Sequence, residues 1–97
     1  MAVHFVWDRS KSESNRRKHR VSFEEASSVF YDEQALLISD PEHSQQEDRF
    51  IMLGMSERFR VLVVCHCYRE NDQEIRIVSS RRANRREVEK YTQRCKP

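Results

Sequence analysis

The chain has 97 residues, of which 35% are charged and 37% hydrophobic, and its formal net charge is +2. This length gives one domain with a modest core, which we take to span residues 1–97. No stretch approaches the roughly 20 apolar residues of a membrane span. The N-terminus also lacks the basic start, apolar stretch and cleavage site of a signal peptide. We therefore expect a cytoplasmic protein with no membrane partner.

The cysteine pattern gives little support to a disulfide or metal framework. An odd count of three argues against paired disulfides. Cys65 and Cys67 flank His66 in an apolar run, and these residues could bind a metal together with some other ligand. A C-x-C pair lacks the second ligand pair of a structural zinc site, so we favour two small buried side chains on one strand face. The sequence predicts no metal and no other cofactor.

Charge is distributed in blocks. Residues 9–20 carry six Lys/Arg and one Glu, and residues 81–97 carry seven Lys/Arg and two Glu. Residues 21–48 carry eight Asp/Glu and no Lys/Arg. Both basic blocks could contact a polyanion, although such blocks are also typical of solvated helix faces.

The first half of the chain predicts a strand and two helices. Apolar and aromatic residues over 3–7 favour a strand, and Asp8 can cap a helix over 9–19. Ser22 and Glu25 have the spacing of a capping box, and apolar spacing continues into a helix over 23–30.

The second half predicts strands over 34–39, 49–55, 60–68 and 74–79, with the single glycine, Gly54, in the turn before the third of these. In the last strand, alternation places Ile75, Ile77 and Ser79 on one face and Arg76, Val78 and Ser80 on the other. Asn84 and Glu87 form a second capping box for a helix over 85–95.

The predicted order is β-α-α-β-β-β-β-α. Four consecutive strands with short turns favour an antiparallel meander. We therefore expect an α+β fold with a mainly antiparallel sheet and helices packed on one face. The opposite sheet face would be free to carry a site.

Three groups of motifs occur in a fixed order along the chain. The first is Phe5-x-Trp7-Asp8 with Asn15-x-x-Lys18-His19-x-Val21-Ser22-Phe23-Glu24-Glu25-Ala26 and Val29-Phe30-x-Asp32. The middle group is Asp40, His43-Ser44, Glu47, Arg49 and Gly54-x-Ser56. The last is Ile75-Arg76-Ile77-Val78-Ser79-x-Arg81-x-Ala83, with Glu87 and Tyr91. Together they span residues 5–91 and resemble BrnT-type toxins.

The resemblance implies a RelE-like fold and the toxin component of a type II toxin–antitoxin system. It implies an endoribonuclease that cuts RNA and inhibits translation. It also implies a ribbon-helix-helix antitoxin of the BrnA type, whose complex with the toxin binds operator DNA. The chain departs from the family in having Arg20 and Phe59 where glycine is usual, and Ser80 where alanine is usual.

Residues 40–49 bring one histidine, four carboxylates and one arginine to the start of a strand. RNA can be cut without metal when its 2′-hydroxyl attacks the adjacent phosphorus, which requires a base, an acid and cations. Glu47 is the candidate base, and His43 is the alternative base or the acid. Arg49 would complete the cluster, although Glu47 and Arg49 could instead form a salt bridge at the strand start.

Arginines further along the chain are candidates for phosphate binding, because guanidinium pairs bidentately with phosphate. We assign Arg76 and Arg81 to the catalytic group with Glu47, His43 and Arg49. The predicted RNA-binding residues are Arg60, Arg82, Arg85 and Tyr91. Tyr91 could stack on a base or donate a proton, but its position on the apolar helix face favours a core role.

Two other classes of function remain open. The basic faces could belong to a non-catalytic module that binds nucleic acid or protein. A metal hydrolase using His43, nearby carboxylates and His66 is less favoured, because no compact H-x-x-x-H motif is present.

Overall fold

The structure, a computed structural model, describes residues 3–39, 49–69, 71 and 73–95. The predicted site residues His43 and Glu47 lie outside these ranges. In chain order the elements are β1 (His4–Val6), α1 (Arg9–His19), α2 (Phe23–Ser28), the short 3-10 helix η1 (Val29–Tyr31), β2 (Leu36–Ser39), β3 (Arg49–Met55), β4 (Val61–Arg69), β5 (Glu74–Arg82) and α3 (Arg85–Cys95).

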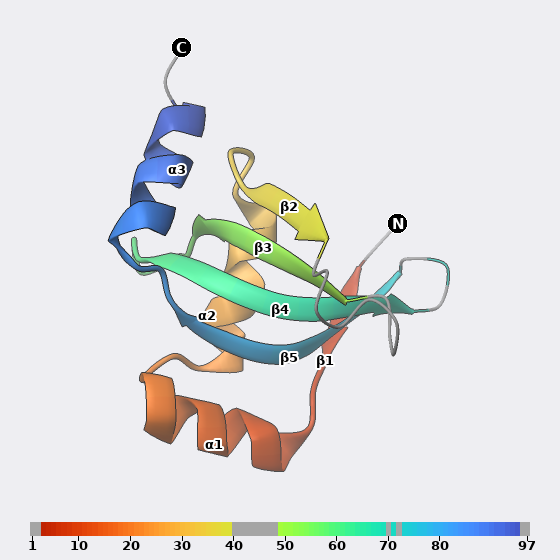
Figure 1. Cartoon of the computed structure of the whole chain (residues 1–97). Coiled ribbons are helices and arrows are strands. Elements are labelled where there is room, and N and C mark those ends of the chain that lie inside the picture. The colour runs from red at the N-terminus through yellow and green to blue at the C-terminus, as the bar shows by residue number, and fades with distance from the viewer. Residues whose placement is uncertain (1–2, 40–48, 70, 72, 96–97) are drawn as a thin grey trace.

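One sheet of five strands forms the centre of the molecule, in the order β1-β5-β4-β3-β2 (Figure 1). β2 to β5 form the predicted antiparallel meander. β1 pairs with β5 in parallel, so the sheet is mainly antiparallel. The predicted α+β class and element order are confirmed, although β5 extends three residues past the predicted end at residue 79.

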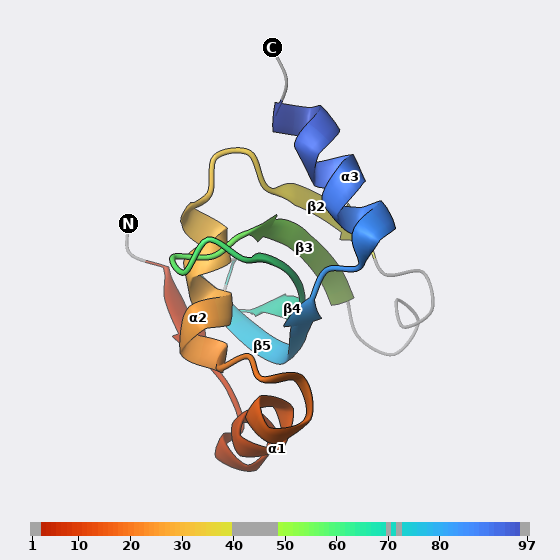
Figure 2. The same ribbon diagram turned by 90° about the vertical axis from the view of Figure 1, so that its left-hand side faces the viewer.

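Helices cover both faces of the sheet. The main core includes Val21, Phe23 and Ala26 from the α1–α2 region, packed against Leu62 and Ile77. On the other face, Tyr91 of α3 packs with Leu53 and Val63. Figure 2 shows α2 and α3 on opposite sides of the sheet. The prediction that all helices pack on one face is therefore wrong for α3, because Leu53 and Val63 alternate toward the face that α1 and α2 leave open.

Local capping signals act as the sequence predicts at the starts of α1 and α3. Asp8 Oδ1 accepts from the Lys11 amide at 3.0 Å, which satisfies a first-turn donor of α1. Asn84 and Glu87 form a complete capping box, with the amide of Glu87 donating to Asn84 at 2.9 Å and the amide of Asn84 donating to Glu87 at 2.8 Å.

Gly54 lies inside β3 and not in the turn that we predicted for it. A Cβ at this position would lie 2.8 Å from a Val29 methyl and 2.9 Å from the Ala35 Cβ. Glycine is therefore required for close approach of η1 and not for turn conformation. Among the described residues, no helix is both long and apolar enough to cross a membrane.

Candidate functional site

A bulge in β5 decides which side chains face the open side of the sheet. Cys65 pairs with Ser79 and His66 pairs with Ile77, so Val78 has no partner of its own on β4. By strict alternation Arg76 and Arg81 would face opposite sides, because five positions separate them. The extra residue reverses the alternation, so Arg76, Ser79 and Arg81 lie on one face, the usual effect of a bulge beside a functional site. The predicted assignment of β5 side chains to the two sheet faces is therefore wrong after Ile77.

The same face carries Arg49 at the start of β3. In register, Arg49 pairs with Cys67 and Cys67 pairs with Arg76, which makes one row across three strands. Adjacent strands lie about 4.8 Å apart, so the backbones of the two arginines are about 10 Å apart. Both arginines therefore stand on the sheet surface that α3 leaves uncovered.

A cavity of about 430 Å³ opens on this surface, and we call it the sheet groove. It is lined by His19, Arg49, Ile51, Val63, Cys65, Val78, Ser79, Ser80 and Arg81. Arg76 shares the face but lies outside this lining. Charged lining residues are cationic, and the lining as described contains no carboxylate. The groove is thus suited to an anion with an apolar portion.

Arg81 is held in place by α3. Its two terminal nitrogens donate to the two carboxylate oxygens of Glu87, each at 2.9 Å. The hydrogen bonds from Arg81 hold the pKa of Glu87 below its ordinary value, and Glu87 in turn raises the pKa of Arg81. This bidentate pair fixes the guanidinium at the end of the groove.

His19 is a groove residue that our assignment of sites missed. It is the last residue of α1, and its imidazole lines the groove together with Arg49 and Arg81. The Lys18-His19 pair in the first motif group was the available signal. Imidazole is suited to proton transfer near neutral pH, which makes His19 a candidate acid or base.

Asn15 attaches α1 to the part of β5 that lies beyond its pairing with β1. Its amide oxygen accepts from the Ser80 amide at 3.0 Å, and its amide nitrogen donates to the Ser80 carbonyl at 2.8 Å. The same nitrogen donates to the Val21 carbonyl at 3.0 Å. One side chain thus imitates a strand partner and satisfies a backbone donor and acceptor that would otherwise form an open edge. Through this contact, α1 holds His19 beside the groove.

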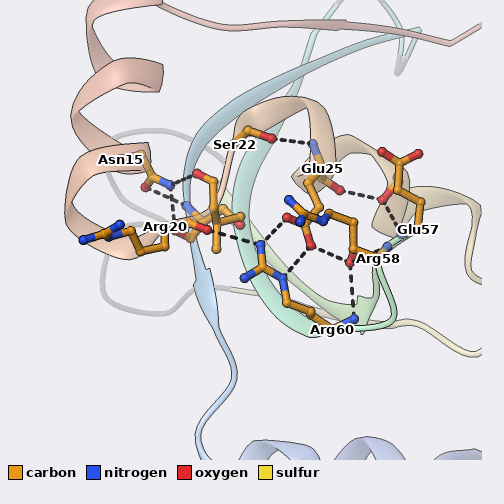
Figure 3. Close-up of polar contacts among 11 residues, drawn as sticks. Asn15, Arg20, Ser22, Glu25, Glu57, Arg58 and Arg60 are labelled. Atoms are coloured by element: carbon orange, nitrogen blue, oxygen red, sulfur yellow. Dashed lines mark hydrogen bonds and ion pairs between the residues drawn. The ribbon is translucent and has the colours of Figure 1, made fainter.

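Arg60, which we predicted to bind RNA, has a partner inside the fold (Figure 3). Its Nε donates to Glu25 at 2.9 Å, and its Nη2 donates to the other carboxylate oxygen of Glu25 and to the Arg20 carbonyl. Ser56 donates to Glu25 at 2.6 Å. Glu25 therefore does not complete the predicted capping box, although Ser22 still accepts from the Glu25 amide at 3.0 Å.

The charge on Glu25 is stabilised by this cluster. Burial alone would raise the pKa of the Glu25 carboxyl. Hydrogen bonds from Arg60 and Ser56, with the positive charges of Arg60 and Arg58, outweigh burial and leave that pKa below its ordinary value. The Glu25 side chain is only 3% exposed, so this pair holds α2 to the turn before β4.

Tyr91 is a core residue of α3. Its ring is buried, and its hydroxyl donates to Asp32 Oδ2 at 2.5 Å. Asp32 also accepts from the amides of Met55 and Gln34. Burial and the hydrogen bond to Asp32 raise the pKa of Tyr91. The tyrosine that we predicted to contact RNA thus joins α3 to the loop after η1.

His66 faces the main core, whereas Cys65 and Cys67 alternate to the opposite face. Its Nδ1 donates to the Val64 carbonyl at 3.2 Å, so its Nε2 is left to accept from the Tyr68 hydroxyl at 3.2 Å. Burial lowers the pKa of His66 to about 4, so the imidazole is neutral at physiological pH. All three cysteines are free thiols. Within the described ranges, no three His, Cys, Asp or Glu side chains gather as metal ligands.

The remaining predicted residues are at the surface. Arg82 is exposed at the end of β5, and its carbonyl accepts from Arg81 at 3.3 Å. Arg85 is exposed in the first turn of α3 and forms an ion pair with Glu89 at 3.6 Å. The structure therefore brings Arg49 and Arg81 into one groove with Arg76 on the same face. Arg60 and Tyr91 instead bind Glu25 and Asp32 within the fold.

Comparisons with known proteins agree with this fold. The family model described as "Ribonuclease toxin, BrnT, of type II toxin-antitoxin system" matches residues 7–87. The crystal structure of the Brucella abortus ribonuclease toxin BrnT superposes with a TM-score of 0.67 at 17% sequence identity. That match covers 87% of this chain and 100% of the Brucella chain, and at this identity it shows the fold alone. No curated protein matches the sequence. The chain belongs to the BrnT family of ribonuclease toxins of type II toxin–antitoxin systems.

Proposed function

We propose that the chain is an endoribonuclease that cuts RNA at the sheet groove by attack of the 2′-hydroxyl, without a metal ion. The observation that supports this most strongly is the bulge at Val78, which lets Arg76 and Arg81 share one face with Arg49. Three guanidinium groups on one sheet face supply the positive charge that a phosphorane needs.

In the proposed reaction the 2′-oxygen attacks phosphorus while the P–O5′ bond breaks. A base takes the 2′ proton, and an acid protonates the leaving 5′-oxygen. The products are a 2′,3′-cyclic phosphate and a 5′-hydroxyl end. Arg49, Arg76 and Arg81 would stabilise the charge that develops on the phosphoryl oxygens.

Glu47 remains our candidate base and His43 the candidate acid or alternative base. Glu47 stands two residues before Arg49 in the sequence, and two residues of backbone span at most about 7 Å. His19 lines the groove directly and is a further candidate for the acid. Arg82 and Arg85, exposed near the same end of β5, would contact flanking phosphates or steer RNA to the groove.

The test is cleavage of a single-stranded RNA in the presence of EDTA, beside the same oligonucleotide with 2′-deoxyribose throughout. We expect cyclic phosphate ends from RNA and no products from the deoxy strand. Cleavage that disappears with EDTA would refute the metal-independent mechanism. Cleavage of the deoxy strand would refute attack by the 2′-hydroxyl.

One observation supports a second candidate, a module that binds RNA without cutting it. The described groove lining supplies cations and a histidine but no carboxylate. A Glu47→Gln variant separates the two proposals. Loss of cleavage with unchanged RNA affinity supports the enzyme, whereas binding without cleavage by the unaltered protein supports the module.

Membership of the family implies an antitoxin partner. We propose a ribbon-helix-helix antitoxin of the BrnA type that covers the sheet groove, and whose complex with the toxin binds operator DNA. We further propose that RNA cleavage inhibits translation, and that the protein acts in the cytoplasm. Mixing the chain with the product of the adjacent gene should abolish cleavage at equimolar ratio. Full cleavage in a stable complex would exclude the groove as the covered surface.

A further inference from the structure

A second and larger cavity lies on the other side of the last turn of α1. Its volume is about 700 Å³, and it is lined by Glu13, Arg16, Arg17, Arg20, Ser22, Glu25 and Arg58. We call it the arginine cavity after its four arginines. The proposed RNA cleavage does not involve these residues. Figure 3 shows Arg20 and Arg58 beside the Glu25–Arg60 pair.

Positive charge is in excess in this cavity. Four guanidinium groups face two carboxylates, and both carboxylates have other partners. Glu25 is hydrogen-bonded to Arg60, and Glu13 forms an ion pair with Arg9 at 3.8 Å. Within the part of the chain that the structure describes, none of the four lining arginines forms an ion pair. The cavity thus offers several exposed guanidinium groups to one anionic ligand.

The cavity is next to the proposed site of cleavage. Arg16, Arg17 and Arg20 line it, whereas His19, from the same turn, lines the sheet groove. A ligand strand that leaves the groove past His19 therefore needs to cross only one helical turn to reach the cavity. This continuity favours a polymer with regularly spaced phosphates over a separate small anion.

Phe59 gives an independent indication of a ligand. Phe59 follows Arg58 directly, the residue is 83% exposed, and its φ is 62°. A bulky residue in the left-handed region is strained, and an exposed aromatic ring loses the benefit of burial. Both costs would be absent with glycine. Strained residues of this kind cluster at active sites and ligand-binding sites, and exposed aromatic rings are platforms on which nucleobases stack.

We propose that the arginine cavity and Phe59 form a second contact for single-stranded RNA. The cavity would bind phosphates of nucleotides that flank the cleaved step, and Phe59 would stack on a base of the same segment. This inference rests on the proposed function of the sheet groove, because it extends the path of the same strand.

The first experiment measures binding of fluorescent 2′-O-methyl RNA, which lacks the attacking hydroxyl and stays intact. The variant Arg17→Gln/Arg58→Gln removes two charges from the cavity. The control Lys11→Gln/Lys90→Gln removes two exposed charges from outside both cavities. Each lost phosphate contact reduces the salt slope by about 0.7, so the cavity variant should lose about 1.4 in slope and roughly 20-fold in affinity at 0.1 M salt. The control should lose much less.

The length of the RNA probe shows whether the affinity lost in the cavity variant comes from the arginine cavity or from the sheet groove. Single-strand sites of small domains span about 4–16 nucleotides, so probes at both ends of this range are used. The loss in the cavity variant should be larger with the long probe. If the unaltered protein cuts RNA and the cavity variant binds the long probe as well as the control does, this inference is refuted and the groove proposal stands. If the unaltered protein neither cuts nor binds RNA, both fail.

The second experiment uses Phe59→Gly, which relieves the strained turn and removes the ring. We expect a Tm at or above that of the unaltered protein and an affinity for the long probe that falls roughly fivefold or more. Unfolding cannot explain that combination. Unchanged RNA affinity with a higher Tm would show that Phe59 is only a strained turn residue. If these variants keep their RNA affinity and lose only the binding of an acidic protein, the cavity is a protein-binding surface and the inference is refuted.

Discussion

The Glu25–Arg60 pair gives the most demanding test of how this fold is stabilised. Arg60→Ala would leave the Glu25 carboxylate, only 3% exposed, with Ser56 as its remaining side-chain donor. Removing one partner of a buried ion pair typically costs about 3–5 kcal/mol. For a domain of this size, about 1 kcal/mol shifts the Tm by roughly 4–8 °C. We therefore expect Arg60→Ala to lower the Tm by at least about 12 °C.

The assays are urea denaturation for the free energy of unfolding and thermal unfolding for the Tm, both at pH 7, with Arg58→Ala as the matched control. Arg58 lies in the same turn, and its charge is the smallest of the causes that lower the pKa of Glu25. Because Arg58 is exposed, its replacement by alanine should cost well under about 1 kcal/mol of unfolding free energy. Replacing both partners with apolar residues, as in Glu25→Leu/Arg60→Met, should recover much of the loss. If Arg60→Ala lowers the free energy of unfolding by less than about 1 kcal/mol, the structural role is refuted and Arg60 is again a candidate RNA contact.

The pH dependence of that loss provides a check on its cause. The pKa of Glu25 in the fold lies below its ordinary value of 4.5. The stabilisation is therefore complete above pH 4.5 and is lost as pH falls through the folded pKa. Without Arg60, burial raises the pKa of the Glu25 carboxyl, so the carboxyl of Arg60→Ala is protonated first as pH falls. The difference in stability between the unaltered protein and Arg60→Ala should therefore narrow as pH falls toward the folded pKa of Glu25 in the unaltered protein. A constant difference down to pH 3 would contradict an ionic cause.

Three further changes test individual contacts. Asn15→Asp removes the donor to the Ser80 and Val21 carbonyls, and we expect a loss of about 2–4 kcal/mol in chemical denaturation. Tyr91→Phe removes a hydrogen bond to a charged Asp32, and a loss of about 1.5–3 kcal/mol should appear in the same assay. His66 has a pKa of about 4 in the fold and an ordinary value of 6.5, so stability should fall by up to about 1.4 kcal/mol per pH unit as pH drops from 6.5 towards 4. The part of this slope above about pH 4.5 should be absent from His66→Phe. A pH-independent stability in the unaltered protein would contradict the buried neutral state of His66.

Local signals in the sequence predicted local structure well. Asp8, Ser22 and Asn84 cap the helices that follow them, because an N-cap acts within three residues of its own position. The antiparallel meander followed from the strand pattern and short turns. These features depend on neighbours in the chain, so a single sequence contains what is needed to predict them.

The features that were missed depend on partners far along the chain. Glu25 fits a capping box by spacing, but its carboxylate binds Arg60, 35 positions away. The Val78 bulge depends on how β5 pairs with β4, which alternation within β5 does not reveal. The position of α3 depends on the Tyr91–Asp32 contact across 59 positions. The sequence motifs indicated Arg49, Arg76 and Arg81 as site residues. Only the strand register of the folded sheet showed that these three arginines share one face.

The most direct test of the central proposal is the single-turnover rate of RNA cleavage by Arg76→Gln, beside Lys90→Gln as a matched loss of one surface charge. Arg76 stands on the open sheet face with Arg49 and Arg81, whereas Lys90 is exposed on α3. If the arginines stabilise the transition state, Arg76→Gln should slow cleavage by roughly 100-fold or more while Lys90→Gln keeps the rate of the unaltered protein. Equal rates in a folded Arg76→Gln protein would contradict the claim that the arginines of this sheet face together stabilise the transition state.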